Sequence, residues 1–199
     1  MRKRELANAC VFVDWNNVRN RFPVNVGKSN AANLRRVIYK IQDECADILR
    51  RSDSTGAFKV TTRFYDGWHR ENRPTSIRLE LEKLFRETSC ERRIGSIYFS
   101  GMKYGNELAC DSFRNPLTAT SRDSGQKMVD TAIVCDFLYL LRQRYVKVGL
   151  IASDDDDFIP AALTAEAWGL EGYLIRSPGR GLDSVTEKIE NSPIKFWRE

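Results

Sequence analysis

Histidine is scarce and C-x-x-C cysteine pairs are absent in this 199-residue chain. His69 is the only histidine and no serine-histidine-aspartate motif surrounds it, which disfavours catalysis by paired imidazoles or by a triad. The five cysteines are widely spaced: Cys10, Cys45, Cys90, Cys110 and Cys135. Because they are odd in number and unpaired in the sequence, we expect reduced thiols and neither a disulfide framework nor a structural zinc site.

Long apolar runs are also missing. No segment approaches the roughly 18 apolar residues of a membrane span. The apolar stretch at 6–13 is too short for a signal peptide and ends at Asp14. We therefore expect a cytoplasmic protein without a membrane partner. No G-x-G-x-x-G sequence follows a strand-like segment, which argues against a dinucleotide-binding dehydrogenase.

The composition is that of an ordinary globular domain, with 42% hydrophobic and 30% charged residues. We expect a single domain over 1–199, with a long loop at 103–125 and a C-terminal tail at 177–199. A loop of this length in a compact domain is usually functional. The net charge of +5 favours a polyanionic partner, although only weakly.

Strand-like and helix-like segments alternate along the chain. Apolar, β-branched and aromatic runs predict strands at 9–13, 58–65, 94–99, 146–152 and 171–175. Apolar residues at helical spacing predict helices at 31–51, 76–87, 126–144 and 160–168, whereas 17–30 has no clear pattern. This alternation predicts an α/β fold whose central parallel sheet, of about five strands, is covered by helices on both faces.

Four consecutive aspartates at 154–157 follow the strand-like run at 146–152 and one serine. Neighbouring carboxylates repel one another and disfavour ionisation, so such a run needs open solvent or a cation. Hard divalent cations such as Mg²⁺ take oxygen ligands, and carboxylates at a strand end supply them. The aspartate run is therefore a candidate part of a metal site.

Acidic residues elsewhere in the chain are expected to reach the same place. Asp14 follows the first strand, and Asp155 and Asp157 follow the fourth, so all three belong to the carboxyl edge of a parallel sheet, where ligands bind. Asp130 stands near the start of the 126–144 helix, on the face that carries its apolar residues. A carboxylate on that face is costly without a partner, which predicts that Asp130 points toward the other acids.

Each of these aspartates also has a structural alternative. Asp157 is suited to cap the helix at 160–168, Asp14 to close a turn, and Asp130 to stabilise a helix N-terminus. Asp136 lies on the same helix as Asp130 but on another face, which makes it a second-tier candidate.

Three motifs, in order along the chain, carry a resemblance to a known family. Residues 11–17 read V-F-V-D-W-N-N, residues 127–130 read K-M-V-D, and residues 153–160 read S-D-D-D-D-F-I-P. Together with Asp136, they resemble the strand-D-x-x-N, K-G-V-D…D and S-G-D-S-D-F-x-P motifs of the NYN domain family, the LabA-like branch of the PIN-like nuclease superfamily. The chain departs from the usual glycine or small residue at three positions: Met128, Asp154 and Asp156.

The resemblance implies a PIN-like three-layer α/β/α fold with strand order 3-2-1-4-5, and a ribonuclease that depends on Mg²⁺ or Mn²⁺. It implies that the metal and catalytic carboxylates are those of Asp14, Asp130, Asp155 and Asp157. Asn17 is expected to orient a water or a phosphate oxygen, and Asp136 and Ser153 are expected in supporting positions. Cleavage of this kind leaves a 5′-phosphate and a 3′-hydroxyl.

Basic and aromatic residues near these motifs and on the loops are the candidates for RNA contacts. Phosphate neutralisation is expected from members of one set: Arg19, Arg21, Lys28, Lys103, Arg114, Arg122 and Lys127. Base stacking is expected from Trp15 above all, and then from Trp68 and Tyr104. A solvated surface charge is the simpler explanation for any one of the basic residues.

Other functions stay open on the sequence alone. The main competitor is a catalytically silent RNA- or protein-binding module of the same fold, and the second is another metal-dependent phosphoesterase. A haloacid-dehalogenase phosphatase is disfavoured because Trp15 and Asn16 follow Asp14 in place of a D-x-D sequence. A Toprim-like domain needs a catalytic glutamate after the first strand, and none is there. The sequence also leaves open a homodimer or a regulatory partner protein.

Overall fold

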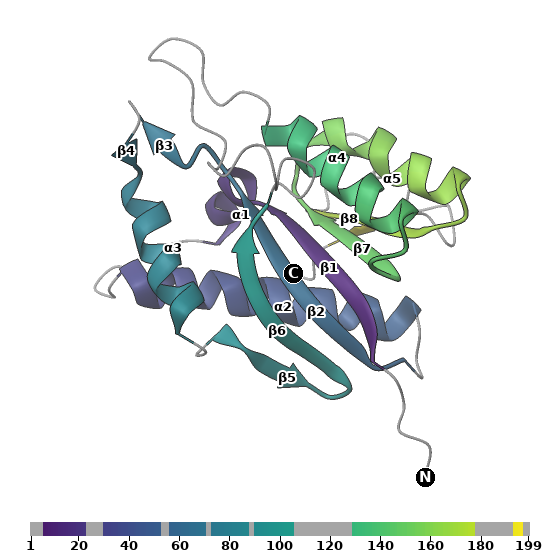
Figure 1. Cartoon of the computed structure of the whole chain (residues 1–199), viewed down its shortest axis with the longest axis horizontal. Helices are drawn as coiled ribbons and strands as arrows, with labels where there is room; N and C mark the ends of the chain where they lie inside the picture. The colour runs from purple at the N-terminus through teal and green to yellow at the C-terminus, as the bar shows by residue number, and fades with distance from the viewer. Residues whose placement is uncertain are drawn as a thin grey trace.

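Seven strands form one sheet in the structure, a computed structural model that describes residues 6–22, 30–52, 56–70, 73–87, 90–105, 129–177 and 193–196. The strands stand in the order β5-β6-β2-β1-β7-β8-β9, and Figure 1 labels all of them except β9. Neighbouring strands run parallel, except that β5 is antiparallel to β6. Their bounds are β1 Ala7–Asp14, β2 Phe58–Tyr65, β5 Arg92–Ile94, β6 Ile97–Tyr104, β7 Val148–Ala152, β8 Glu171–Arg176 and β9 Ile194–Phe196.

The helices connect these strands. The α-helices in the described residues are α1 Trp15–Arg21, α2 Asn30–Ser52, α3 Ser76–Arg86, α4 Val129–Arg142 and α5 Ile159–Ala167. A short 3-10 helix, η2 (Asp156–Phe158), leads into α5, and β3 (His69–Arg70) pairs with β4 (Arg73–Pro74) outside the main sheet. In the described parts of the chain, no helix has both the length and the apolar character needed to cross a membrane.

The predicted α/β class and the mostly parallel central sheet are confirmed. The five predicted strands correspond to β1, β2, β6, β7 and β8, and they stand in the sheet in the order third, second, first, fourth, fifth. The sheet is larger than predicted because β5 and β9 extend its two edges. Each has only three residues, too few to show an alternating pattern in the sequence.

Two predicted irregular segments are partly regular. The segment at 17–30 was expected to lack regular structure, yet its residues 17–21 belong to α1. The loop expected from Lys103 begins later, because β6 continues to Tyr104. Gly95, with a φ of 64°, turns the chain between β5 and β6, so the predicted strand at 94–99 covers the last residue of β5, the turn and the start of β6. Residues 106–125 of the predicted loop lie outside the described residues.

Alternate residues of the strands supply two hydrophobic cores, one on each face of the sheet. In β1, Ala9, Val11 and Val13 belong to the core that includes residues of α2 and α3. Cys10 and Phe12 belong to the other core, with residues of α4 and α5. Because successive strand side chains point to opposite faces, this division gives helical layers on both sides of the sheet (Figure 1).

Two glycines allow α4 to lie close to the sheet. A Cβ at Gly149 of β7 would lie 2.9 Å from the Phe137 ring, and one at Gly172 of β8 would lie 2.6 Å from it. The Gly172 Cβ would also lie 2.7 Å from Ala165 Cβ. Phe137 is fully buried and meets Phe12 edge-on, with 5.6 Å between ring centroids. The missing side chains on β7 and β8 therefore set the depth at which α4 packs.

The thiols are expected to differ sharply in reactivity. Burial raises the pKa of Cys10 to about 12 and that of Cys45 well above its usual range, and Cys90 is also buried. Cys135 is exposed on α4. Because the thiolate is the reactive form, iodoacetamide at mildly alkaline pH should modify Cys135 in the folded protein. Peptide mass spectrometry should find Cys10, Cys45 and Cys90 modified only after denaturation, and early labelling of Cys10 would contradict the described packing.

Candidate acidic site

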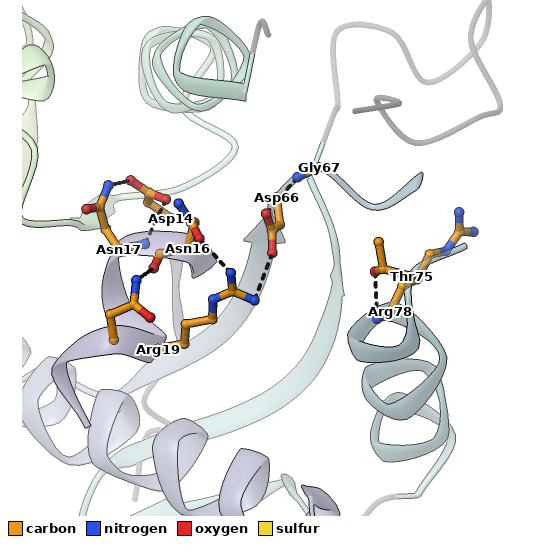
Figure 2. Close-up of polar contacts among 9 residues, drawn as sticks. Asp14, Asn16, Asn17, Arg19, Asp66, Gly67, Thr75 and Arg78 are labelled. Atoms are coloured by element: carbon orange, nitrogen blue, oxygen red, sulfur yellow. Dashed lines mark hydrogen bonds and ion pairs between the residues drawn. The ribbon is translucent and has the colours of Figure 1, made fainter. Parts of the chain in front are cut away.

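Asp14 is the last residue of β1 and is almost fully buried. Its carboxylate caps α1 by accepting a hydrogen bond from the backbone N–H of Asn17 at 3.4 Å. It also accepts one from the side-chain amide of Asn17 (Figure 2). Asp14 therefore ends a strand at the carboxyl edge of the sheet and also begins the helix that follows.

Ser153 joins Asp14 to the aspartate run. This serine follows β7, is fully buried, and donates its hydroxyl to Asp14 Oδ2 at 2.7 Å. The same hydroxyl oxygen accepts a hydrogen bond from the backbone N–H of Asp155 at 3.1 Å. Asp155 in turn caps η2 by accepting from the backbone N–H of Asp157 at 3.0 Å. A continuous set of hydrogen bonds thus connects the ends of β1 and β7, which are neighbours in the sheet.

Asp130 comes close to the same residues from the first turn of α4. Partial burial raises the pKa of its carboxyl, and the negative charges of Asp14, Asp155 and Asp157 raise it further. Charge effects of this kind need proximity, because solvent screens distant pairs. The four carboxylates singled out in the sequence, Asp14, Asp130, Asp155 and Asp157, therefore lie in one electrostatic environment, which we call the acidic site.

The donor set of the acidic site suits a hard divalent cation, since Mg²⁺ and Mn²⁺ prefer oxygen ligands. A cation bound there would offset the repulsion by which Asp14, Asp155 and Asp157 add to the effect of burial on the Asp130 pKa. Among the described residues, however, no group of three or more His, Cys, Asp or Glu side chains is placed to hold a metal ion. Oxygens of Asp14 and Asp155 accept from local donors instead. Metal binding here stays a prediction, and it requires the carboxylates to turn toward a common point.

The other two aspartates of the run attach it to the end of β8. Asp154 accepts hydrogen bonds from the backbone N–H of Ser177 at 2.6 Å and from its hydroxyl at 2.9 Å. Asp156 forms an ion pair with the buried Arg176, with 2.5 Å between Oδ1 and Nη1. Asp155 and Asp157 thus belong to the acidic site, whereas Asp154 and Asp156 contact residues at the end of β8. This division of partners explains how four adjacent carboxylates are accommodated.

Asp136, the second-tier candidate, has a different environment. It is buried in α4 and accepts a hydrogen bond from the Tyr65 hydroxyl at 2.7 Å. Burial raises the pKa of Tyr65 well above its usual range, and the charge of Asp136 adds to this effect. The contact joins α4 to the end of β2, so Asp136 fixes the position of the helix that carries Asp130.

Removing the Tyr65 hydroxyl should therefore weaken the fold. Tyr65→Phe leaves a buried carboxylate with one donor fewer, and we expect a loss of about 1–3 kcal/mol in the free energy of unfolding. Urea denaturation measures this loss. Tyr98→Phe is the matched control, since its exposed hydroxyl bonds Glu91 at 3.0 Å, and it should leave stability unchanged. Equal midpoints for the two variants would show that the Tyr65–Asp136 contact contributes nothing.

Asp66 is a further carboxylate at this edge that was not predicted as a site residue. Asp66 follows β2, and the register that aligns Asp14 with Tyr65 brings Asp66 to the same edge as Asp14. Figure 2 shows Arg19 between Asn16 and Asp66. Arg19 donates to Asn16 Oδ1 at 2.7 Å and lies 4.0 Å from Asp66 Oδ2. The strand-end position of Asp66 was a usable signal, but its distance from Asp14 depended on the strand order.

The predicted RNA contacts have mixed outcomes. Trp15 was expected to stack bases, but it is fully buried and packs edge-on against Phe64, so it offers no exposed stacking face. Trp68 is also buried, with its ring 4.8 Å from that of Tyr104. Lys103 is exposed near the end of β6, and Arg21 donates to the Ser177 hydroxyl. Four predicted contacts lie outside the described residues: Lys28, Arg114, Arg122 and Lys127.

Comparison with known proteins adds no assignment: no protein-family model matches the chain, and no curated protein matches it. The resemblance to NYN domains therefore stays a prediction, and it rests on the three sequence motifs alone. Chemically, the acidic site combines carboxylate oxygens, the kind of ligand that hard cations prefer, with donors that fix the orientation of Asp14 and Asp155.

Proposed function

We propose that the chain is a nuclease that hydrolyses phosphodiester bonds of RNA with Mg²⁺ or Mn²⁺ at the acidic site. The observation that carries this proposal is the hydrogen-bonded connection from Asp14 through Ser153 to Asp155. Asp130 lies near enough that the charges of Asp14 and Asp155 add to the effect of burial and raise the pKa of its carboxyl. The observed strand order supports the finer assignment to a PIN-like fold, which the three motifs suggest.

In this proposal the four carboxylates of the acidic site hold the cation. When bound, the cation lowers the pKa of a water molecule and offsets negative charge on the phosphate. Ser153 keeps Asp14 and Asp155 in a fixed relation through its two hydrogen bonds. The Asn17 amide donates to Asp14, so we assign Asn17 the role of orienting this carboxylate. Lys103, exposed near the carboxyl end of β6, is the described basic residue that we assign to neutralising a phosphate.

A nuclease assay on the full chain tests the proposal. End-labelled RNA and DNA of the same sequence are incubated with Mn²⁺, with Mg²⁺ or with EDTA. We expect cleavage of RNA in the presence of either metal, no cleavage in EDTA, and products with 5′-phosphate and 3′-hydroxyl ends. Cleavage that persists in EDTA would contradict the metal requirement, and intact RNA under all conditions would contradict the activity.

A thermal-unfolding measurement tests the cation site without relying on activity. A ligand that binds only the folded state raises the melting temperature. We expect Mn²⁺ to raise the melting temperature of the parent protein and to leave that of Asp14→Asn nearly unchanged. Equal shifts in the two proteins would mean that the ion binds elsewhere.

A catalytically silent RNA-binding module is the second candidate. It is favoured by one observation, that the described acidic residues are not arranged as a ready metal centre. The two functions differ in outcome, because a silent module would retain RNA on a filter in Mn²⁺ and leave it intact.

A further inference from the structure

A cavity of about 400 Å³ is bordered by α1 and by the first turns of α2 and α3. Trp15 and Arg19 of α1 line it, and Trp15 directly follows Asp14 in the chain. The volume lies within the usual range for pockets that bind small ligands. Because α1 begins directly after Asp14, a group bound in this cavity lies at the same edge of the sheet as the acidic site, on the face covered by α2 and α3.

Positive charge dominates the polar lining of the cavity. Among the described lining residues, Arg19 and Arg36 supply guanidinium groups, against the single carboxylate of Glu80. The first residues of two helices, Asn30 of α2 and Ser76 of α3, also line it. Helix N-termini carry partial positive charge, so both favour acceptor atoms or negative charge. The lining thus selects a ligand that is rich in hydrogen-bond acceptors.

Trp15 gives an independent sign of a missing acceptor. Its side chain is fully buried, and its indole N–H has no hydrogen-bond partner among the described residues. Buried donors are nearly always paired, because an unpaired one carries a desolvation cost. Trp15 lines the cavity, so a ligand bound there borders its indole ring, and a small shift of the lining side chains would expose the N–H to an acceptor atom.

The remaining walls are apolar. Phe22, Leu34, Val37 and Ile77 line the cavity along with Trp15. A flat ring with acceptor atoms on its edge satisfies both parts of the lining, since its faces meet the apolar residues and its edge meets the donors. Nucleobases have this character, and unstacked bases of single-stranded RNA are commonly bound in this manner.

We propose that this cavity binds one nucleobase of the RNA strand, with an acceptor atom of the base at the Trp15 indole N–H. The proposal rests on the proposed function, because it makes the cavity the specificity pocket for a nucleotide close to the cleaved bond. It also gives Trp15 a role in place of the exposed stacking that its burial rules out.

Binding of oligonucleotides with a missing base tests the pocket separately from cleavage. The probe is a short fluorescein-labelled RNA of mixed sequence, together with a series in which each nucleotide in turn is abasic. Fluorescence anisotropy measures the dissociation constants in EDTA, so that the strand stays intact. We expect one abasic position to weaken binding about tenfold, in line with the contribution of a single recognised base.

Three variants locate the effect. Leu34→Trp fills the cavity, and should bind the intact RNA as weakly as the parent binds the sensitive abasic RNA, with no further loss from the abasic site. Trp15→Phe removes the N–H, and should show a smaller abasic effect. Leu79→Trp adds the same bulk at an exposed position of α3 outside the cavity lining, and should behave as the parent.

The outcomes separate the pocket from the nuclease activity. A single sensitive position that is lost in Leu34→Trp supports the pocket, whether or not the parent protein cleaves RNA. Absence of RNA binding, equal binding of all abasic oligonucleotides, or full sensitivity in Leu34→Trp would overturn it, even if cleavage is found. If Leu34→Trp does not fold, the abasic series on the parent and on Trp15→Phe still decides the question.

Discussion

The Asp14→Asn protein is expected to fold and to lose metal-dependent RNA cleavage by roughly two orders of magnitude or more, since a bound cation supplies several kcal/mol of transition-state stabilisation. Asparagine has nearly the size of aspartate but lacks the negative charge that a cation needs. Asp14 is almost fully buried at the end of β1, where Ser153 and Asn17 both donate hydrogen bonds to its carboxylate. First-order rates of cleavage of an end-labelled RNA in Mn²⁺ measure the effect.

Two comparisons make the Asp14→Asn result specific. Asp155→Asn should show a similar loss, because it removes a second carboxylate of the acidic site. Asp47→Asn is the matched control, since Asp47 forms an ion pair with Arg50 within α2 and belongs to a different part of the fold. It should cleave at the rate of the parent protein. Full cleavage by both Asp14→Asn and Asp155→Asn, with folding verified by circular dichroism, would sink the assignment.

Truncation of Phe137 is expected to have the largest effect on stability. Phe137→Ala removes a fully buried ring that packs on Phe12 and over two glycines, and should cost about 3–5 kcal/mol of the free energy of unfolding. Gly172→Ala should cost about 1–3 kcal/mol, because its Cβ would meet the same ring and Ala165 at distances that packed atoms do not adopt. Urea denaturation with a fixed m-value measures both changes.

The double variant shows whether the two losses have one cause. In Phe137→Ala/Gly172→Ala the new methyl group enters space that the ring has left, so the combined loss should be smaller than the sum of the single losses. Gly101→Ala is the control for the glycine change, because a Cβ there meets no atom within 4 Å. Additive losses, or a Gly101→Ala loss equal to that of Gly172→Ala, would contradict the described packing of α4.

The parts of the fold that could be predicted are those whose burial leaves a long signal in the sequence. β2 was predicted with its observed bounds, because its alternating and aromatic residues are buried along most of its length. β5 and β9 have three residues each, and their pairing depends on where β6 and β8 lie. The short helix α1 buries only Trp15 and Val18, which gives no periodic pattern.

For the site, the positions of the acidic residues could be predicted from the sequence, but the contacts around them could not. The strand ends and the apolar face of the 126–144 helix predicted that Asp14, Asp130 and Asp155 lie at one edge of the sheet. The pKa of Asp130, which burial and then the charges of the other two acids raise, agrees with this. The same reasoning misjudged Trp15, because adjacency to Asp14 along the chain does not reveal that α1 turns the indole into the core. Asp66 was undervalued, since its closeness to Asp14 follows from the pairing of β1 with β2.

The hydrogen bond between Ser153 and Asp14 also bears on when the acidic site can form during synthesis. The two residues are 139 positions apart in the chain, and the strands that carry them, β1 and β7, pair directly. Contacts between such distant residues form late and slow folding. A nascent chain that has not yet been extended past Ser153 has β1 without one of its two neighbours and Asp14 without its buried donor. A ribosome-bound fragment should therefore be unable to attack RNA near the ribosome until most of the described fold has been translated.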